Sequence, residues 1–157
     1  AEGGSGPVVL GEDVQGILSN LVQSITPAPA DHAIDVPIEV DGGPHLVAGA
    51  PELTFTYTGT AGSGDRPQRV CAQLVDGDAG LVIGNQITPI QVELDGEQHT
   101  VTVPLEMVAF SAEPGAALRL QLVATTVAYA EPQLGGQLDV ESIELTLPVT
   151  EAMERTD

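Results

Sequence analysis

Residues 70–130 read VCAQLVDGDAGLVIGNQITPIQVELDGEQHTVTVPLEMVAFSAEPGAALRLQLVATTVAYA, and this stretch decides the fold of the chain. It consists of short apolar runs separated by Gly, Asp, Asn and Pro, which are the residues that turns require. Because apolar and polar residues alternate within most of these runs, each run is expected to form a β-strand with one face in a core. The stretch therefore predicts an all-β domain.

Within this stretch, the order of strands and turns can be followed in detail. Residues 70–75 form a mostly apolar run, which predicts a buried strand, and residues 76–80 supply the turn that follows it. Residues 90–94 and 101–105 each alternate apolar with polar residues. Because Asp95-Gly96 tolerates the positive φ angles of tight turns, we expect these two strands to pair as a hairpin.

The same period of two extends beyond the stretch on its N-terminal side. Leu53, Phe55 and Tyr57 alternate with threonines, which predicts a strand with its aromatic face in the core. Residues 34–40 alternate in the same way and contain Pro37. Since proline cannot donate a backbone hydrogen bond, we expect this strand at the edge of a sheet.

The final strands show a break in this pattern. Leucines at positions 118, 120 and 122 share one face, with Arg119 and Gln121 on the other. In residues 138–147, however, the apolar positions change from even to odd between Val140 and Ile143. An extra residue near Glu141 and Ser142 would restore a single inward face, so we expect a β-bulge there.

A helix is expected only near the N-terminus. Residues 12–25 place apolar side chains at the i, i+3, i+4, i+7 spacing, and the prolines of residues 26–31 end the pattern. The chain thus divides into a linker with a short amphipathic helix (1–31), a β-sandwich (32–150) and a polar tail (151–157). Roughly eight strands recurring about every 8 to 12 residues predict an antiparallel two-sheet sandwich of the jelly-roll type.

The composition agrees with one small domain. The chain has 157 residues, of which 42% are hydrophobic but only 3% aromatic, so aliphatic side chains must fill the core. Cys71 is the only cysteine and lies in an apolar run, which predicts a buried, inert thiol. No apolar run approaches the roughly 18 residues that a membrane-spanning helix needs.

Acidic residues dominate the charge. The chain has 23 Asp and Glu against 4 Arg, which gives a net charge of -19. Such a charge repels phosphate groups, so nucleic acids and anionic lipid surfaces are not expected partners. A well-solvated surface explains the acidity most simply, and a basic partner protein or a high-salt habitat are the alternatives.

Candidate nucleophiles lack the pattern of a serine hydrolase. That pattern is Gly-x-Ser-x-Gly between a strand and a helix. Ser5 stands in GGSGP and Ser63 in AGSGD, each in a loop of small residues and each with a mismatched flank. The histidines, His32, His45 and His99, are far apart and lack the spacing of metal sites. We therefore expect surface or hydrogen-bonded histidines and no catalytic residue in this chain.

The sequence offers candidates for a calcium site and for a glycan-binding site. The DGDAG turn at residues 76–80 could ligate Ca²⁺ through carboxylates and carbonyls, although turn chemistry alone explains its residues. Otherwise no cofactor is expected. Glycan binding usually relies on exposed aromatic rings, and parity leaves only Phe110 and Tyr129 as possible ligand contacts.

Five segments carry a resemblance to a known family. They are LTFTYTGTA, AQLVD, VIGNQITPI, LDGEQHTVTVPLE and LQLVATTVAYA, which together span most of residues 53–149. In this order and spacing they resemble the C-terminal, galactose-binding-like jelly-roll domain of the cocaine esterase and X-Pro dipeptidyl-peptidase serine hydrolases. In that family the catalytic triad lies in a separate α/β-hydrolase domain, against which the jelly roll packs and whose active site it helps to wall.

The resemblance implies a non-catalytic module that assists an α/β-hydrolase domain. It carries no triad residue onto this chain. The alternatives are an extracellular or cell-envelope binding module for a glycan or a protein, and a structural subunit of an envelope assembly. The chain would be part of a longer protein, a processed fragment or a stand-alone homologue. A secreted or cell-envelope location is expected, with the cytoplasm left open.

Overall fold

The computed structural model describes residues 29, 33–42, 44–62, 68–124 and 135–150. Nearly all of its regular structure is β-strand, with one short 3₁₀ turn, η1. The elements are β1 (Ile34–Ile38), β2 (His45–Gly49), β3 (Glu52–Ala61), β4 (Arg69–Asp76), β5 (Leu81–Val82), η1 (Ile83–Asn85), β6 (Thr88–Gln91), β7 (Asp95–Pro104), β8 (Val108–Ala112), β9 (Leu118–Val123), β10 (Gly136–Thr146) and β11 (Val149–Thr150). All strand pairs are antiparallel.

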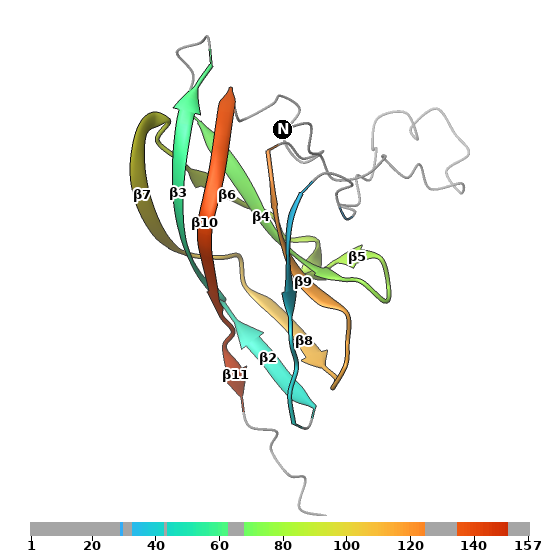
Figure 1. Cartoon of the computed structure of the whole chain (residues 1–157). Helices are drawn as coiled ribbons and strands as arrows, with labels where there is room; N and C mark the ends of the chain where they lie inside the picture. The colour runs from blue at the N-terminus through green and yellow to red at the C-terminus, as the bar shows by residue number, and fades with distance from the viewer. Residues whose placement is uncertain (1–28, 30–32, 43, 63–67, 125–134, 151–157) are drawn as a thin grey trace, which may run out of the picture.

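Two layers face each other (Figure 1). One layer has the strand order β1-β9-β4-β5, with β6 also paired to β4. The other is formed by β10-β3-β7 and is continued by β11-β2-β8. The antiparallel two-sheet sandwich predicted from the sequence is confirmed.

Prolines explain why the second layer is divided into two short sheets. Pro51 lies between β2 and β3, Pro104 ends β7, and Pro148 lies between β10 and β11. Because proline has no N–H to donate, regular strand pairing is interrupted between β2 and β3, between β7 and β8, and between β10 and β11. The backbone still connects across the break, since Leu105 N–H donates to the Pro51 carbonyl oxygen at 2.7 Å.

The core fills the space between the layers, and it is largely aliphatic. Its buried side chains include Leu53, Phe55 and Tyr57 on β3 and Leu118, Leu120 and Leu122 on β9. The alternation predicted for both strands is therefore confirmed. β1 lies at the edge of its sheet among the described strands, as Pro37 predicts.

The predicted β-bulge in the last long strand is also confirmed. Val140 pairs with Tyr57, whereas Ser142 pairs with Thr56, so Glu141 is the additional residue. Leu138 and Ile143, on either side of the bulge, both pack against the core. The change of parity in the sequence thus had the structural cause that was expected.

The predicted hairpin between residues 90–94 and 101–105 is wrong. Gly96 has the positive φ of 88° that an Asp-Gly turn requires. However, β6 pairs with β4 in one layer, whereas β7 pairs with β3 in the other. Val92 and Leu94 are buried, so this segment crosses the core from one layer to the other instead of pairing back on itself.

The predicted amphipathic helix at residues 12–25 and the polar tail at 151–157 lie outside the described residues. Within the part that is described, no helix has the length and hydrophobicity needed to cross a membrane.

Candidate functional site

A pocket of about 380 Å³ opens beside Phe110. Its walls come from the turn after β4, from Ile83 in η1 and from the turn between β8 and β9. Phe110 is half-buried, with part of its side chain packed against the core. The acidic residues Asp76, Asp78 and Glu113 line the same pocket. The structure therefore brings together two features that the sequence analysis treated separately, the DGDAG turn and a possible aromatic ligand contact.

The carboxylates of this turn hold the loops that shape the pocket. Asp76 Oδ1 accepts hydrogen bonds from the backbone N–H groups of Asp78 and Ala79, both at 3.0 Å. Asp78 Oδ2 accepts a hydrogen bond from the backbone N–H of Ala117, also at 3.0 Å, and so ties this turn to the turn before β9. These bonds are the turn chemistry that the sequence suggests. Calcium binding at residues 76–80 stays a prediction.

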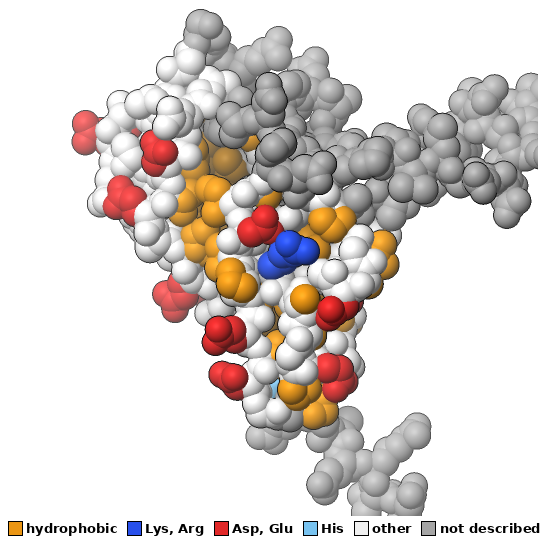
Figure 2. Space-filling model, turned by 45° about the vertical axis from the view of Figure 1, so that its right-hand side comes forward, with side chains coloured by type: hydrophobic (Ala, Val, Ile, Leu, Met, Phe, Trp, Pro, Cys, Tyr) orange, Lys and Arg blue, Asp and Glu red, His pale blue; other side chains and the backbone are white. Residues whose placement is uncertain are grey.

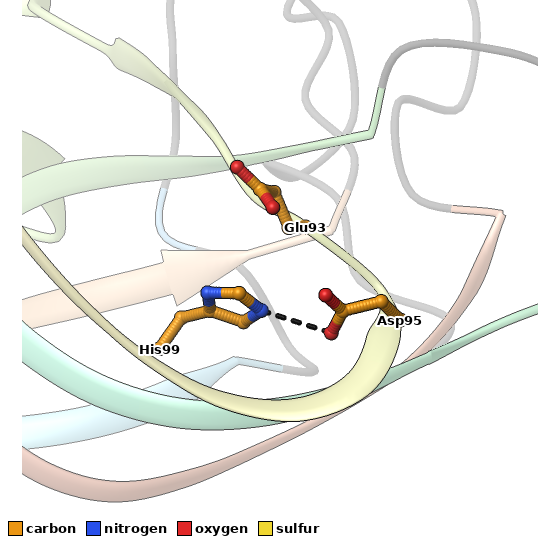
Figure 3. A group of neighbouring side chains, drawn as sticks. All are labelled: Glu93, Asp95 and His99. Carbon is orange, nitrogen blue, oxygen red and sulfur yellow. Dashed lines mark hydrogen bonds and ion pairs between the residues drawn. The ribbon is translucent and has the colours of Figure 1, made fainter.

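A second candidate site lies where the chain turns from the core into β7. Glu93, Asp95 and His99 each offer a ligand atom, and these atoms all lie within 4.8 Å of one another (Figure 3). His99 Nε2 and Asp95 Oδ1 are 2.9 Å apart, which is hydrogen-bonding distance. We name these three residues the turn cluster. Among the described residues, this is the group of three Asp, Glu, His or Cys side chains whose ligand atoms lie close enough together to hold a metal ion.

The buried side chain of Tyr57 contacts two members of the turn cluster from the core side. Its hydroxyl oxygen accepts a hydrogen bond from the backbone N–H of Glu93 at 2.8 Å. Its ring centroid is 5.7 Å from that of His99, with the ring planes tilted by 32°. Because Tyr57 is 1% exposed and fixed in the core, it gives the exposed cluster a rigid support.

The contacts within the turn cluster shift two pKa values. The hydrogen bond to Asp95 raises the pKa of His99, and the charges of Asp95 and other nearby carboxylates add to this effect. The hydrogen bond from His99 lowers the pKa of Asp95, and a second hydrogen bond from the backbone N–H of Glu97 lowers it further. Each group therefore favours the charged form of the other.

The other predicted residues are placed as follows. His45 Nε2 lies 2.8 Å from the backbone oxygen of Asp41, so it is a hydrogen-bonded histidine as expected. Cys71 is fully buried, and this burial raises the pKa of its thiol to about 11, which agrees with an inert cysteine. Tyr129, His32, Ser5 and Ser63 lie outside the described residues.

The sequence analysis did not predict the turn cluster, because it considered only the spacing between histidines and not the carboxylates near each histidine. Its sequence signal is one carboxylate two residues before the Asp95-Gly96 pair (Glu93), a second within that pair (Asp95), and His99 on the strand that leaves the turn. A reversal at Gly96 brings the first and last of these residues together. A search for donors across each Asp-Gly turn would have found the cluster.

No protein-family model matches this chain, and no curated protein matches it significantly. The resemblance to the esterase and dipeptidyl-peptidase family is therefore a hypothesis.

Proposed function

We propose that this chain is a non-catalytic β-sandwich module that packs against an α/β-hydrolase domain of the X-Pro dipeptidyl-peptidase or cocaine esterase type. It would contribute packing area and part of the wall around the active site, in a secreted or cell-envelope protein. The segments that carry the resemblance lie largely in β3, β4, β7 and β9, which pair within the two layers. They are consistent with a scaffold role.

The observation that carries the proposal is the open side of the sandwich. β6 and β7 are joined by residues 92–94 and so lie on one side, which leaves β1 and β10 as edge strands on the opposite side of the described fold. Apolar side chains of both edge strands pack against the core but are only partly buried: Val36 and Ile38 on β1, and Leu138, Val140, Ile143 and Leu145 on β10. We call these six residues the edge strip.

Apolar side chains reach the surface in a strip on the face drawn in Figure 2, with acidic side chains around it. An apolar area with a polar rim is typical of a surface that another domain covers. A partner packed over the edge strip would also shield the unpaired backbone groups of two strand edges. An adjoining hydrolase domain meets both requirements.

The non-catalytic part of the proposal is tested by assaying the purified chain alone. With p-nitrophenyl acetate and with an alanyl-prolyl p-nitroanilide, the expected rate equals that of buffer. Turnover that disappears in Ser5→Ala or Ser63→Ala would show a nucleophile in this chain and refute the proposal. Turnover that survives both substitutions and still co-elutes with the chain after a further purification step would refute the proposal as well.

A second candidate function, a binding module, is favoured by the pocket beside Phe110. One aromatic ring and three carboxylates could receive sugar hydroxyl groups or the cationic groups of a protein partner. Binding on a glycan array, or to a basic peptide, should then weaken in Phe110→Ala. Met107→Ala is the matched control, because Met107 is an apolar side chain that is 72% exposed and is absent from the pocket lining.

A further inference from the structure

The turn cluster differs from the many other acidic groups of this chain because it includes an imidazole nitrogen. Glu93 and Asp95 supply carboxylate oxygens, and His99 supplies Nε2, all within 4.8 Å of one another. Two carboxylates and one histidine are a donor set that first-row divalent metal ions accept. Ca²⁺ and Mg²⁺ prefer oxygen ligands alone, so the imidazole favours a transition metal or zinc.

The three side chains are held in place by separate features of the fold. Glu93 lies between Val92 and Leu94, which are buried, so its own side chain must face outward. The Asp95 carboxylate is oriented by the backbone N–H of Glu97, which donates to Oδ1 at 2.9 Å. His99 pairs with Tyr57 across the sheet, and its ring lies beside the tyrosine ring. The donors therefore converge without any rearrangement of the backbone.

The surroundings of the turn cluster suit a cation. Glu93 and Asp95 are exposed, and the His99 side chain is 26% exposed, so water molecules can complete the coordination of a bound ion. The carboxylates give the cluster a negative charge, and the net charge of -19 raises the concentration of cations around the whole chain. In the absence of metal, the hydrogen bond between His99 and Asp95 keeps both donor atoms in place, and a bound ion would displace the proton that they share to solvent.

We propose that Glu93, Asp95 and His99 form a surface binding site for one first-row divalent metal ion, with Zn²⁺ as the reference ion. The ion would be bound by Nε2 of His99 and by one oxygen of each carboxylate. By joining residues before and after the Asp95-Gly96 turn, it would fix the point where the chain passes from the core into β7. This site is independent of the proposed association with a hydrolase.

The test is Zn²⁺ titration of the full chain without a polyhistidine tag, followed by calorimetry at constant pH. Co²⁺ provides a second probe, because its visible absorption reports nitrogen and oxygen ligation. We expect one ion per chain. His99→Ala and Glu93→Gln should each weaken Zn²⁺ binding by about tenfold or more, since each removes a ligand or its charge.

His45→Ala is the matched control, because His45 is the other described histidine and bonds to the backbone of Asp41. It should bind Zn²⁺ like the unmodified chain. Circular dichroism verifies that each variant is folded, and Glu93→Gln, an exposed substitution, keeps the test valid if His99→Ala unfolds. Absence of binding at millimolar Zn²⁺, or equal binding by Glu93→Gln and the unmodified chain, would overturn the proposal. Equal displacement of Zn²⁺ by Ca²⁺ would overturn the choice of metal.

Discussion

At the scale of single residues, the pair formed by His99 and Asp95 connects the structure to a measurable pH dependence. Their side chains share a hydrogen bond, which raises the pKa of His99 above 6.5 and lowers the pKa of Asp95 below 3.8. The stabilisation from His99 is complete below pH 6.5 and is lost as the pH rises through its folded pKa. The stabilisation from Asp95 is complete above pH 3.8 and is lost as the pH falls through its folded pKa.

The first prediction is that metal-free His99 titrates above its ordinary pKa and that Asp95→Asn brings the value back toward 6.5. The substitution keeps the size of the side chain but removes its charge, so it separates the electrostatic effect from packing. NMR titration of the carbon-bound protons of the His99 imidazole provides the measurement. Identical His99 titration in both proteins would contradict this assignment of the shift.

The second prediction concerns the thiol of Cys71. Its pKa of about 11 follows from burial, so thiolate is scarce at neutral pH and the sulfur is also inaccessible. We expect a disulfide reagent such as 5,5′-dithiobis(2-nitrobenzoic acid) to leave the native chain unlabelled at pH 8 and to label one thiol in denaturant. Rapid labelling of the native chain would show that β4 is less well covered than described.

The third prediction compares two leucines of different burial. Leu120 is 0% exposed in the centre of β9, whereas Leu81 is 51% exposed at the start of β5. Leu120→Ala should lower the free energy of unfolding by about 2 to 5 kcal/mol, because it removes buried methyl groups and leaves a cavity. Leu81→Ala should change it by less than about 0.5 kcal/mol. Urea denaturation measures both, and equal effects would contradict the described core.

At the scale of the strand, the β-bulge in β10 gives the fourth prediction. Glu141 is the unpaired residue, so its deletion should leave every other residue of β10 on its present face. Its side chain accepts exposed hydrogen bonds from Thr58 and Gln98, whose loss costs about 1 to 2 kcal/mol. The deleted chain should therefore fold.

Deletion of Glu144 is the matched control, because it removes the same residue type three positions later. It would turn Leu145 and Leu147, which pack against the core, toward solvent. We expect the Glu144 deletion to be far less stable than the Glu141 deletion in thermal unfolding followed by circular dichroism. Equal stability of the two deletions would mean that Glu141 is not the additional residue.

The strands also show how far the sequence predicts this fold. The period of two identified β3 and β9 and their buried faces, because burial on one face is a local property of each strand. The parity change predicted a bulge near Glu141 and Ser142 for the same reason, and the structure places it at Glu141. Which strands pair is a non-local property, so the Asp95-Gly96 turn was recognised but the partners of β6 and β7 were not.

The candidate sites also combine local features, which the sequence predicts, with non-local contacts, which it does not. The alternation of residues predicted that Phe55 and Tyr57 are buried, which left Phe110 as a possible ligand contact. The pocket beside Phe110, however, depends on turns far away in the sequence. The turn cluster is local in sequence, yet its convergence depends on Tyr57, which lies on a different strand. Sequence alone therefore gave the residue types, whereas the tertiary structure brought them together.

At the scale of the whole molecule, the edge strip on β1 and β10 is the surface to which the proposed function assigns a partner. Under the proposed function, a hydrolase domain covers these partly buried apolar residues, which would otherwise be presented to water. Substitution within the edge strip should then affect association more than folding. Val36→Gln and Ile143→Gln place a polar group on each edge strand, and Thr146→Gln, at an exposed position of β10, is the control.

The most direct test measures binding of this chain to the α/β-hydrolase domain of a cocaine esterase or X-Pro dipeptidyl-peptidase prepared without its own C-terminal domain. Isothermal titration calorimetry should detect association. We predict that Val36→Gln and Ile143→Gln, once shown to be folded, weaken it by about tenfold or more, while Thr146→Gln leaves it unchanged. Absence of binding, or equal binding by all three variants, would contradict the proposal that the edge strip packs against a hydrolase domain.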